Sequence, residues 1–139
     1  MPNSTTHLFV GVLAGGGYAY LANPSDDQLC RLSSCVGGIV GGFLTARLPD
    51  ILDPPVHYAH RSLGHSFILN GAALLLGYSK WRRLIQQCQK LADQALEKAD
   101  TDQASKWHFL AGMLAGLPMG IGSHLVLDFF TPVSLPLLF

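Results

Sequence analysis

The chain has 139 residues, enough for one domain with its own core, and we treat residues 1–139 as a single domain. Hydrophobic residues make up 49% and charged residues 13% of it, whereas soluble proteins carry roughly 25% charged residues. The net charge of zero gives no electrostatic basis for nucleic-acid binding, which excludes that class of function. The 15 glycines among the apolar stretches favour a membrane protein over a very apolar soluble bundle.

Four apolar stretches predict helices over residues 7–21, 33–48, 66–78 and 107–130. The third is expected to continue through the amphipathic segment 80–99, and the prolines within 49–65 predict a loop there. The expected fold is therefore all-α: a membrane-embedded bundle of about four helices that run alternately up and down. The first three stretches are short for a bilayer, and the fourth is long enough to cross one.

Glycines repeat at four-residue spacing within three of these stretches. Such spacing lets helix backbones approach closely in membranes, and it predicts tight packing and a homo-oligomer formed through the glycine-rich faces. The glycines are Gly11 and Gly15, then Gly37, Gly38, Gly41 and Gly42, then Gly112, Gly116 and Gly120.

The distribution of basic residues predicts how the bundle is oriented in the membrane. Six of the nine Lys and Arg residues lie within 80–106, which the positive-inside rule assigns to the cytoplasm. The opposite end of a multi-pass bundle would then face the periplasm or the exterior. The N-terminus lacks the charge pattern of a removable signal peptide. Cys30, Cys35 and Cys88 fit ordinary thiols better than a disulfide framework.

Residues that commonly bind metals gather at the opposite end from the basic segment. An alternating bundle brings together the start of the first helix, the end of the second, the start of the third and the end of the fourth. Scattered core histidines would not sort in this way, so the pattern predicts a metal site. The six residues at these termini are His7, Asp50, His60, His65, His124 and Asp128.

The spacing and number of these residues indicate a multi-metal site. His124 and Asp128 are four residues apart and share one helix face. Asp53 can bridge or bind a further ion, although it could also cap a turn before Pro54. The ligands then exceed what one ion needs, so we expect two or more divalent ions, zinc first, with manganese or iron as alternatives. Such sites activate water and hold phosphoryl groups.

Three further residues, Arg61, His57 and His108, carry separate expectations. Arg61 is placed to hold an anionic substrate oxygen, or else to pair with Asp50. We therefore expect Arg61 and Asp53 to take part in catalysis. His57 has no fixed partner in the predicted loop, and His108 falls at the far end, so neither is included as a ligand.

The ordered motifs resemble the membrane-bound metal-dependent hydrolase family, also described as LexA-binding, inner-membrane-associated hydrolases. They are Thr6-His7, the segment 49–53 (PDILD), the segment 60–66 (HRSLGHS), and 124–128 (HLVLD) followed by Thr131-Pro132. The family usually has one residue between its two aspartates, where this chain has two, and Ser62 and Gly64 replace a glycine and a threonine. The family also looks distantly similar to zinc-dependent phospholipase C, which implies phosphate-ester hydrolysis by analogy.

Two functions follow as alternatives. The first is an inner-membrane, metal-dependent hydrolase of the phosphoesterase type, acting on a membrane lipid or a lipid-linked phosphate. The second is a non-catalytic membrane protein in which metal joins four helix ends and the basic helix 80–106 binds a partner. The surplus of ligands and Arg61 favour the enzyme.

Overall fold

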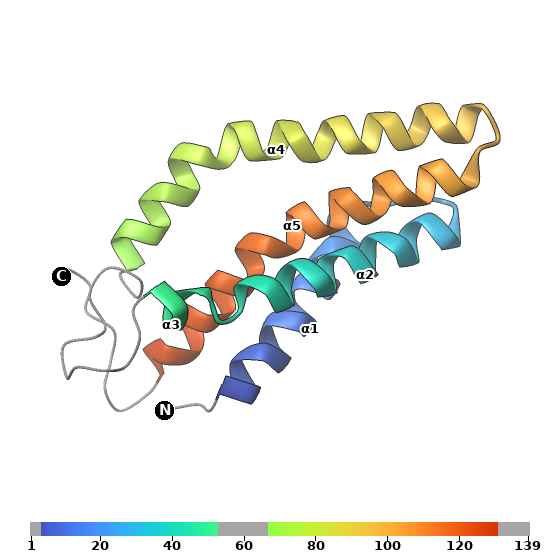
Figure 1. Ribbon diagram of the computed structural model, residues 1–139. Coiled ribbons are helices and arrows are strands. Elements are labelled where there is room, and N and C mark those ends of the chain that lie inside the picture. Colours follow the sequence, from blue (N-terminus) through green and yellow to red (C-terminus); the bar gives the residue numbers. More distant parts are fainter. Residues whose placement is uncertain (1–3, 53–66, 131–139) are drawn as a thin grey trace.

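The computed structural model describes residues 4–52 and 67–130, and these residues form an all-α bundle, as predicted (Figure 1). The helices are α1 (Ser4–Ala22), α2 (Gln28–Thr45), α3 (Leu48–Leu52), α4 (Phe67–Glu97) and α5 (Thr101–Phe129). The predicted continuation of the third helix through its amphipathic part is confirmed, because α4 is unbroken.

Three helices, α1, α2 and α5, begin earlier than predicted, and polar residues cap the last two. α2 begins at Gln28, where Asp27 accepts a 2.9 Å hydrogen bond from the Cys30 N–H. α5 begins after Asp100, which accepts a 2.9 Å bond from the Gln103 N–H. Both carboxylates satisfy donors that the first helical turn leaves unpaired. The predicted starts followed apolar content alone and missed these polar first turns.

The predicted loop over residues 49–65 was wrong at its beginning. The short helix α3 occupies Leu48–Leu52 and carries Asp50 in its first turn. Pro49 fits there, because the first helical turn makes no use of the N–H that proline lacks. The remainder of the predicted loop, residues 53–65, lies outside the described residues.

Helices α1, α2 and α5 pack through their glycines, which confirms the predicted close approach. Gly15 meets the backbone of Gly38, and Gly38 in turn meets Gly116, so three backbones come together at one level. A Cβ at any of these positions would collide with a neighbouring main chain. Because these faces are occupied within the chain, their use between two copies is a separate prediction that a single chain does not test. The other glycines packed against a neighbouring helix are Gly11, Gly16, Gly37, Gly41, Gly42, Gly112 and Gly120.

The pairing of residues gives the helix directions. Gly11 and Gly15 face Gly42 and Gly38 in reverse order, so α1 and α2 are antiparallel. Ser34 and Gly38 of α2 face Gly112 and Gly116 of α5 in the same order, so α2 and α5 are parallel, and α4 returns antiparallel to α5. The start of α1, the end of α2 with α3, and the end of α5 therefore meet at one end of the molecule (Figure 1).

Helix α4 packs along α5 and is anchored to it by Trp81. Pro118 has no N–H, so the Leu114 carbonyl one turn before it lacks its usual helical donor. The Trp81 Nε1–H donates to that carbonyl at 3.0 Å. Nearer the turn between the two helices, the Gln89 side chain donates to Asn23 Oδ1 at 2.6 Å.

Among the described residues, two helical segments are long and apolar enough to cross a membrane: Gln28–Leu52, with a mean hydropathy of 1.4, and Thr101–Phe129, with 1.5. The basic helix α4 is not one of them. The outer face of α2 exposes large apolar side chains such as Leu32, Val36 and Phe43, each at least half exposed. An apolar outer face of this kind suits contact with lipid.

Candidate metal centre

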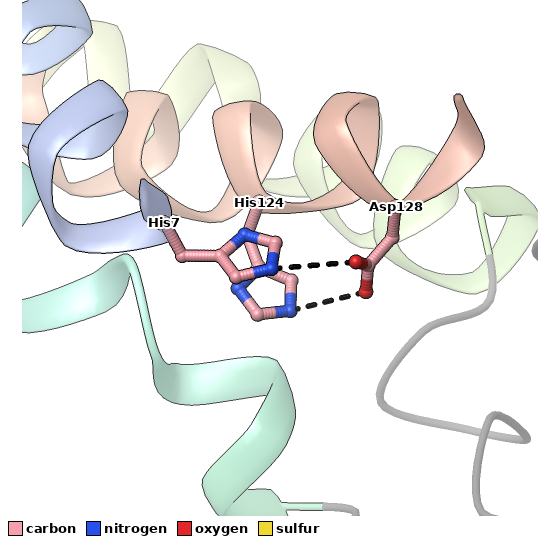
Figure 2. A group of neighbouring side chains, drawn as sticks. All are labelled: His7, His124 and Asp128. Carbon is pink, nitrogen blue, oxygen red and sulfur yellow. Dashed lines mark ion pairs between the residues drawn. The ribbon is translucent and has the colours of Figure 1, made fainter. Parts of the chain in front are cut away.

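Three buried side chains from α1 and α5 converge at the end of the bundle described above. His7 is the fourth residue of α1, and His124 and Asp128 lie one turn apart on α5. Their exposed fractions are 3%, 0% and 3%. The two imidazole rings stack with centroids 3.9 Å apart and direct their Nε2 atoms toward the Asp128 carboxylate (Figure 2).

A fourth residue, Asp50 of α3, completes what we call the His–Asp cluster: His7, Asp50, His124 and Asp128. Its Oδ1 lies 3.4 Å from His124 Nε2. With 35% of its side chain exposed, Asp50 is the member that solvent reaches most easily. It lies there because α2 ends at Thr45 and α3 turns the chain back over the end of α5.

The main chain fixes the orientation and tautomer of His124. Ala46 ends α2, and its carbonyl has no partner within that helix. His124 Nδ1 lies 2.6 Å from this oxygen, and since a carbonyl only accepts, Nδ1 carries the hydrogen. In the neutral ring, Nε2 then presents a lone pair. Metal-binding histidines generally donate their other ring N–H to a carbonyl or carboxylate in this way.

The lone pair on His124 Nε2 faces two carboxylates. Ionised carboxylates accept hydrogen bonds and cannot donate them, so three acceptors face one another here. Nε2 is 3.4 Å from Asp50 Oδ1 and 3.4 Å from Asp128 Oδ2. Like-polarity atoms buried at this separation repel unless a positive species lies among them. A second proton on the imidazole or a bound cation would each supply such a species.

The distances fit a metal ion better than a proton. Charge-assisted N–H···O bonds usually measure about 2.7–2.9 Å, whereas the three His–Asp pairs here measure 3.3, 3.4 and 3.4 Å. Two ligands at about 2.0–2.1 Å from one tetrahedral zinc ion lie about 3.3–3.4 Å apart. His7, His124 and Asp128 also have donor atoms within 4.8 Å of one another. The residues present therefore fit a divalent ion.

Asp128 is the central residue of the cluster. Its Oδ1 lies 3.3 Å from His7 Nε2, and its Oδ2 lies 3.4 Å from His124 Nε2. A carboxylate that turns one oxygen to each histidine can bind one ion through both oxygens or bridge two ions. With neutral imidazoles, the two carboxylates of the cluster carry two negative charges, which favours the binding of divalent cations.

The predicted ligands divide into two groups. His7, Asp50, His124 and Asp128 come together as expected from the alternating topology. The other predicted site residues, His60, His65, Asp53 and Arg61, lie outside the described residues, as does His57. His108, which was not included among the ligands, is buried in α5 four turns before His124.

One contributor escaped the sequence analysis. The Ala46 carbonyl orients His124, but a main-chain acceptor leaves no mark in side-chain identity. Its position follows only from where α2 ends, and the predicted end was residue 48 instead of Thr45. Gly11 is a second indirect contributor, because its missing side chain makes room for the Ala46 methyl group.

The fold and the cluster define a helical membrane protein with a candidate metal centre at one end of its bundle. All of residues 1–139 match the family described as YdjM inner membrane protein, and the chain belongs to this family. No curated protein and no solved structure matches it. The predicted inner-membrane location agrees with the family description.

The same finding corrects the resemblance drawn from the sequence motifs. The matched family is described as an inner membrane protein, and this description names neither a hydrolase nor phospholipase C. The assignment to a metal-dependent hydrolase family related to zinc-dependent phospholipase C was therefore wrong. Four of the motif residues still converge in the His–Asp cluster, and the geometry of this cluster is the basis for inferring its chemistry.

Proposed function

We propose that the protein is a membrane-bound, metal-dependent hydrolase acting on phosphate esters of lipids or lipid-linked compounds. One observation carries the proposal: His124, held by the Ala46 carbonyl, turns a lone pair toward Asp50 and Asp128 in a buried site. This arrangement fits a divalent cation, and a cation at the end of a membrane bundle is placed to act on phosphate groups at the bilayer surface.

A divalent ion supplies Lewis acidity toward a phosphoryl oxygen and makes water a better nucleophile. The protein's own groups supply position. Ala46 keeps the His124 ring in one orientation, and the stacked His7 ring restricts it further. Asp50 gives the site its more exposed side, where water and substrate can approach. Arg61 and Asp53 are expected to contact the anionic substrate and the ions.

We infer two or more ions, with zinc favoured and manganese or iron as alternatives. The two oxygens of Asp128 face different histidines, which supports a bridging role. Imidazole and carboxylate ligands suit all three metals. His60 and His65 are expected to complete the coordination.

The experiment is a hydrolysis assay on purified protein, with phospholipids and lipid-linked phosphates as substrates, in the presence and absence of a chelator. The wild type should release phosphate or a headgroup, and the chelator should abolish this activity. Asp128→Asn should lower both metal content and turnover, because a neutral amide is a poorer ligand for a hard cation. Arg61→Ala should lower turnover and leave metal content intact. Absence of chelator-sensitive turnover across the panel would argue against an enzyme.

The burial of the cluster supports a second candidate function. Three of its four members are at most 3% exposed, which is typical of a closed structural site. In this alternative the metal only joins the helix ends, and the basic helix α4 binds a partner. A single ion without an open coordination position, together with no turnover, would favour it.

We also infer a multi-pass topology, with the α4–α5 turn in the cytoplasm and the His–Asp cluster facing the periplasm, from the basic residues between Lys80 and Lys106. Single cysteines at Ser4 and Gln103, in a background without native cysteines, test this with a membrane-impermeant maleimide. Ser4→Cys should react in intact cells, and Gln103→Cys only after the membrane is opened. The reverse pattern, or reaction of both in intact cells, would contradict this topology.

A further inference from the structure

A large apolar cavity lies between α4 and the rest of the bundle. Its volume is about 680 Å³, within the range of roughly 300–1,000 Å³ usual for ligand sites. Most of its lining is contributed by α4 and α5, including Ala73, Gly77 and Trp81 of α4 and Pro118 and Ile121 of α5, and Tyr18 of α1 closes one side. The cavity exists because α4 diverges from α5 toward its own N-terminus (Figure 1).

The wall of the cavity is open at Gly77. A Cβ at this position would meet nothing within 4 Å, in contrast to the tightly packed glycines between α1, α2 and α5. The neighbouring Leu75 and Leu76 are 79% and 83% exposed, so these large side chains do not fill the space. An apolar cavity that the protein's own side chains leave open suits an apolar ligand.

Two of the polar side chains that line the cavity, Trp81 and Gln89, are already paired. The Trp81 Nε1–H is used by the Leu114 carbonyl, so the indole offers its hydrocarbon face. Gln89, at the end nearest the α4–α5 turn, donates to Asn23 and Ala22. Arg82 and Gln86 also line the cavity, on the side of Gly77 nearer the α4–α5 turn. On the side nearer the His–Asp cluster, Ala73, Gly77 and Ile121 offer apolar surface, against which a hydrocarbon chain needs no polar partner.

The cavity is aligned with the His–Asp cluster. Ile121 lines it, and Asp128 lies seven residues further along α5, on the same helix face two turns away. Seven residues of helix span about 10 Å. A ligand whose tail lay beside Ile121 would thus have its polar end near the Asp128 carboxylate.

We propose that this cavity holds an acyl chain of a membrane glycerophospholipid, with the phosphate of the same molecule directed toward the His–Asp cluster. The proposal rests on the proposed function, and it narrows the substrate from lipids and lipid-linked phosphates to a glycerophospholipid. Membership of an inner-membrane protein family supports it, since acyl chains surround such a protein at the depth of its apolar helices.

The experiment uses Trp81 as a reporter of chains within the cavity. In a Trp107→Phe background, Trp81 is the remaining tryptophan. The protein is placed in vesicles of phosphatidylglycerol with brominated or ordinary acyl chains, and bromine quenching is measured. Gly77→Leu fills the cavity without a clash, and Gly71→Leu is the matched control, because Gly71 lies on the same helix, also has open space, and does not line the cavity.

Quenching should be strong in the starting protein and in Gly71→Leu, and lost in Gly77→Leu. Leucine is a better helix former than glycine, so neither change is expected to unfold α4. Equal quenching in both variants would mean that bromine reaches Trp81 only from the surrounding bilayer, and it would overturn the proposal. Equal loss in both would overturn it as well.

A further variant separates this inference from the proposed function. Asp128→Asn alters the cluster and leaves the cavity lining unchanged, so quenching should persist while hydrolysis is lost. If no lipid is hydrolysed by the wild type and the quenching pattern still holds, the proposed function fails and the acyl-chain site stands. If lipids are hydrolysed and Gly77→Leu changes neither quenching nor rate, the cavity has no part in binding them.

Discussion

The hydrogen bond between Trp81 and the Leu114 carbonyl should depend on the proline four residues further along α5. Pro118 leaves this carbonyl without its usual N–H donor, and Trp81 supplies one from α4. Trp81→Phe keeps most of the aromatic surface and removes the donor. In the wild-type background the carbonyl would then lose its partner. In a Pro118→Ala background, the new N–H at residue 118 can take over the role.

The magnitude follows from the cost of leaving a carbonyl without a partner. That cost is about 1–3 kcal/mol for a group shielded from water. Trp81→Phe also removes packing area, but it does so in both backgrounds, and this part cancels in a double-mutant cycle. The coupling free energy between residues 81 and 118 should therefore be about 1–3 kcal/mol.

The assay is reversible unfolding of the four proteins in mixed detergent micelles, followed by circular dichroism. The free energy of unfolding should fall more for Trp81→Phe with Pro118 present than with alanine in its place. A coupling within about 0.5 kcal/mol of zero, the usual limit of additivity, would refute this explanation. The result matters for the site, because this bond anchors α4 to the helix that carries His124 and Asp128.

Three further predictions concern single positions. The Cys30 N–H lowers the pKa of the Asp27 carboxyl below its usual value of 3.8. The stabilisation from this cap is therefore present above pH 3.8 and should be lost as the pH falls through the lower folded-state pKa. Thermal unfolding of Asp27→Asn should lack that pH dependence and retain a cap. Ala99 has a left-handed φ of 56° after α4, so Ala99→Gly should raise the free energy of unfolding by about 0.5–1 kcal/mol, and a decrease would contradict this. Gly42→Leu would collide with the Gly11 backbone and should lower the free energy of unfolding by at least about 1–3 kcal/mol, whereas Gly17→Leu, which has open space, should not.

Hydrophobic periodicity and helix direction were sufficient to predict the all-α bundle and the end at which the ligands meet. Glycine spacing predicted close packing, since backbone contact needs residues without side chains. Helix starts were less predictable, because capping by Asp27 and Asp100 places polar residues inside the helices. The short helix α3 was missed because Pro54 and Pro55, which follow it, were interpreted as excluding a helix throughout residues 49–65.

The candidate site was predictable in its side chains and not in its main chain. Spacing alone put His124 and Asp128 on one face, and topology added His7 and Asp50. The Ala46 acceptor depends on the three-dimensional end of α2. The cavity beside Trp81 depends on the divergence of α4 from α5, which no local pattern encodes.

Elemental analysis of the purified protein tests the metal centre most directly. Wild-type protein should carry at least one divalent ion per chain, with zinc expected first. His108→Gln, a change of a buried histidine outside the His–Asp cluster, should carry the same amount, while His124→Ala and Asp128→Asn should lose it. Wild-type protein without stoichiometric metal, or metal retained in both cluster variants, would contradict a metal centre at His7, Asp50, His124 and Asp128.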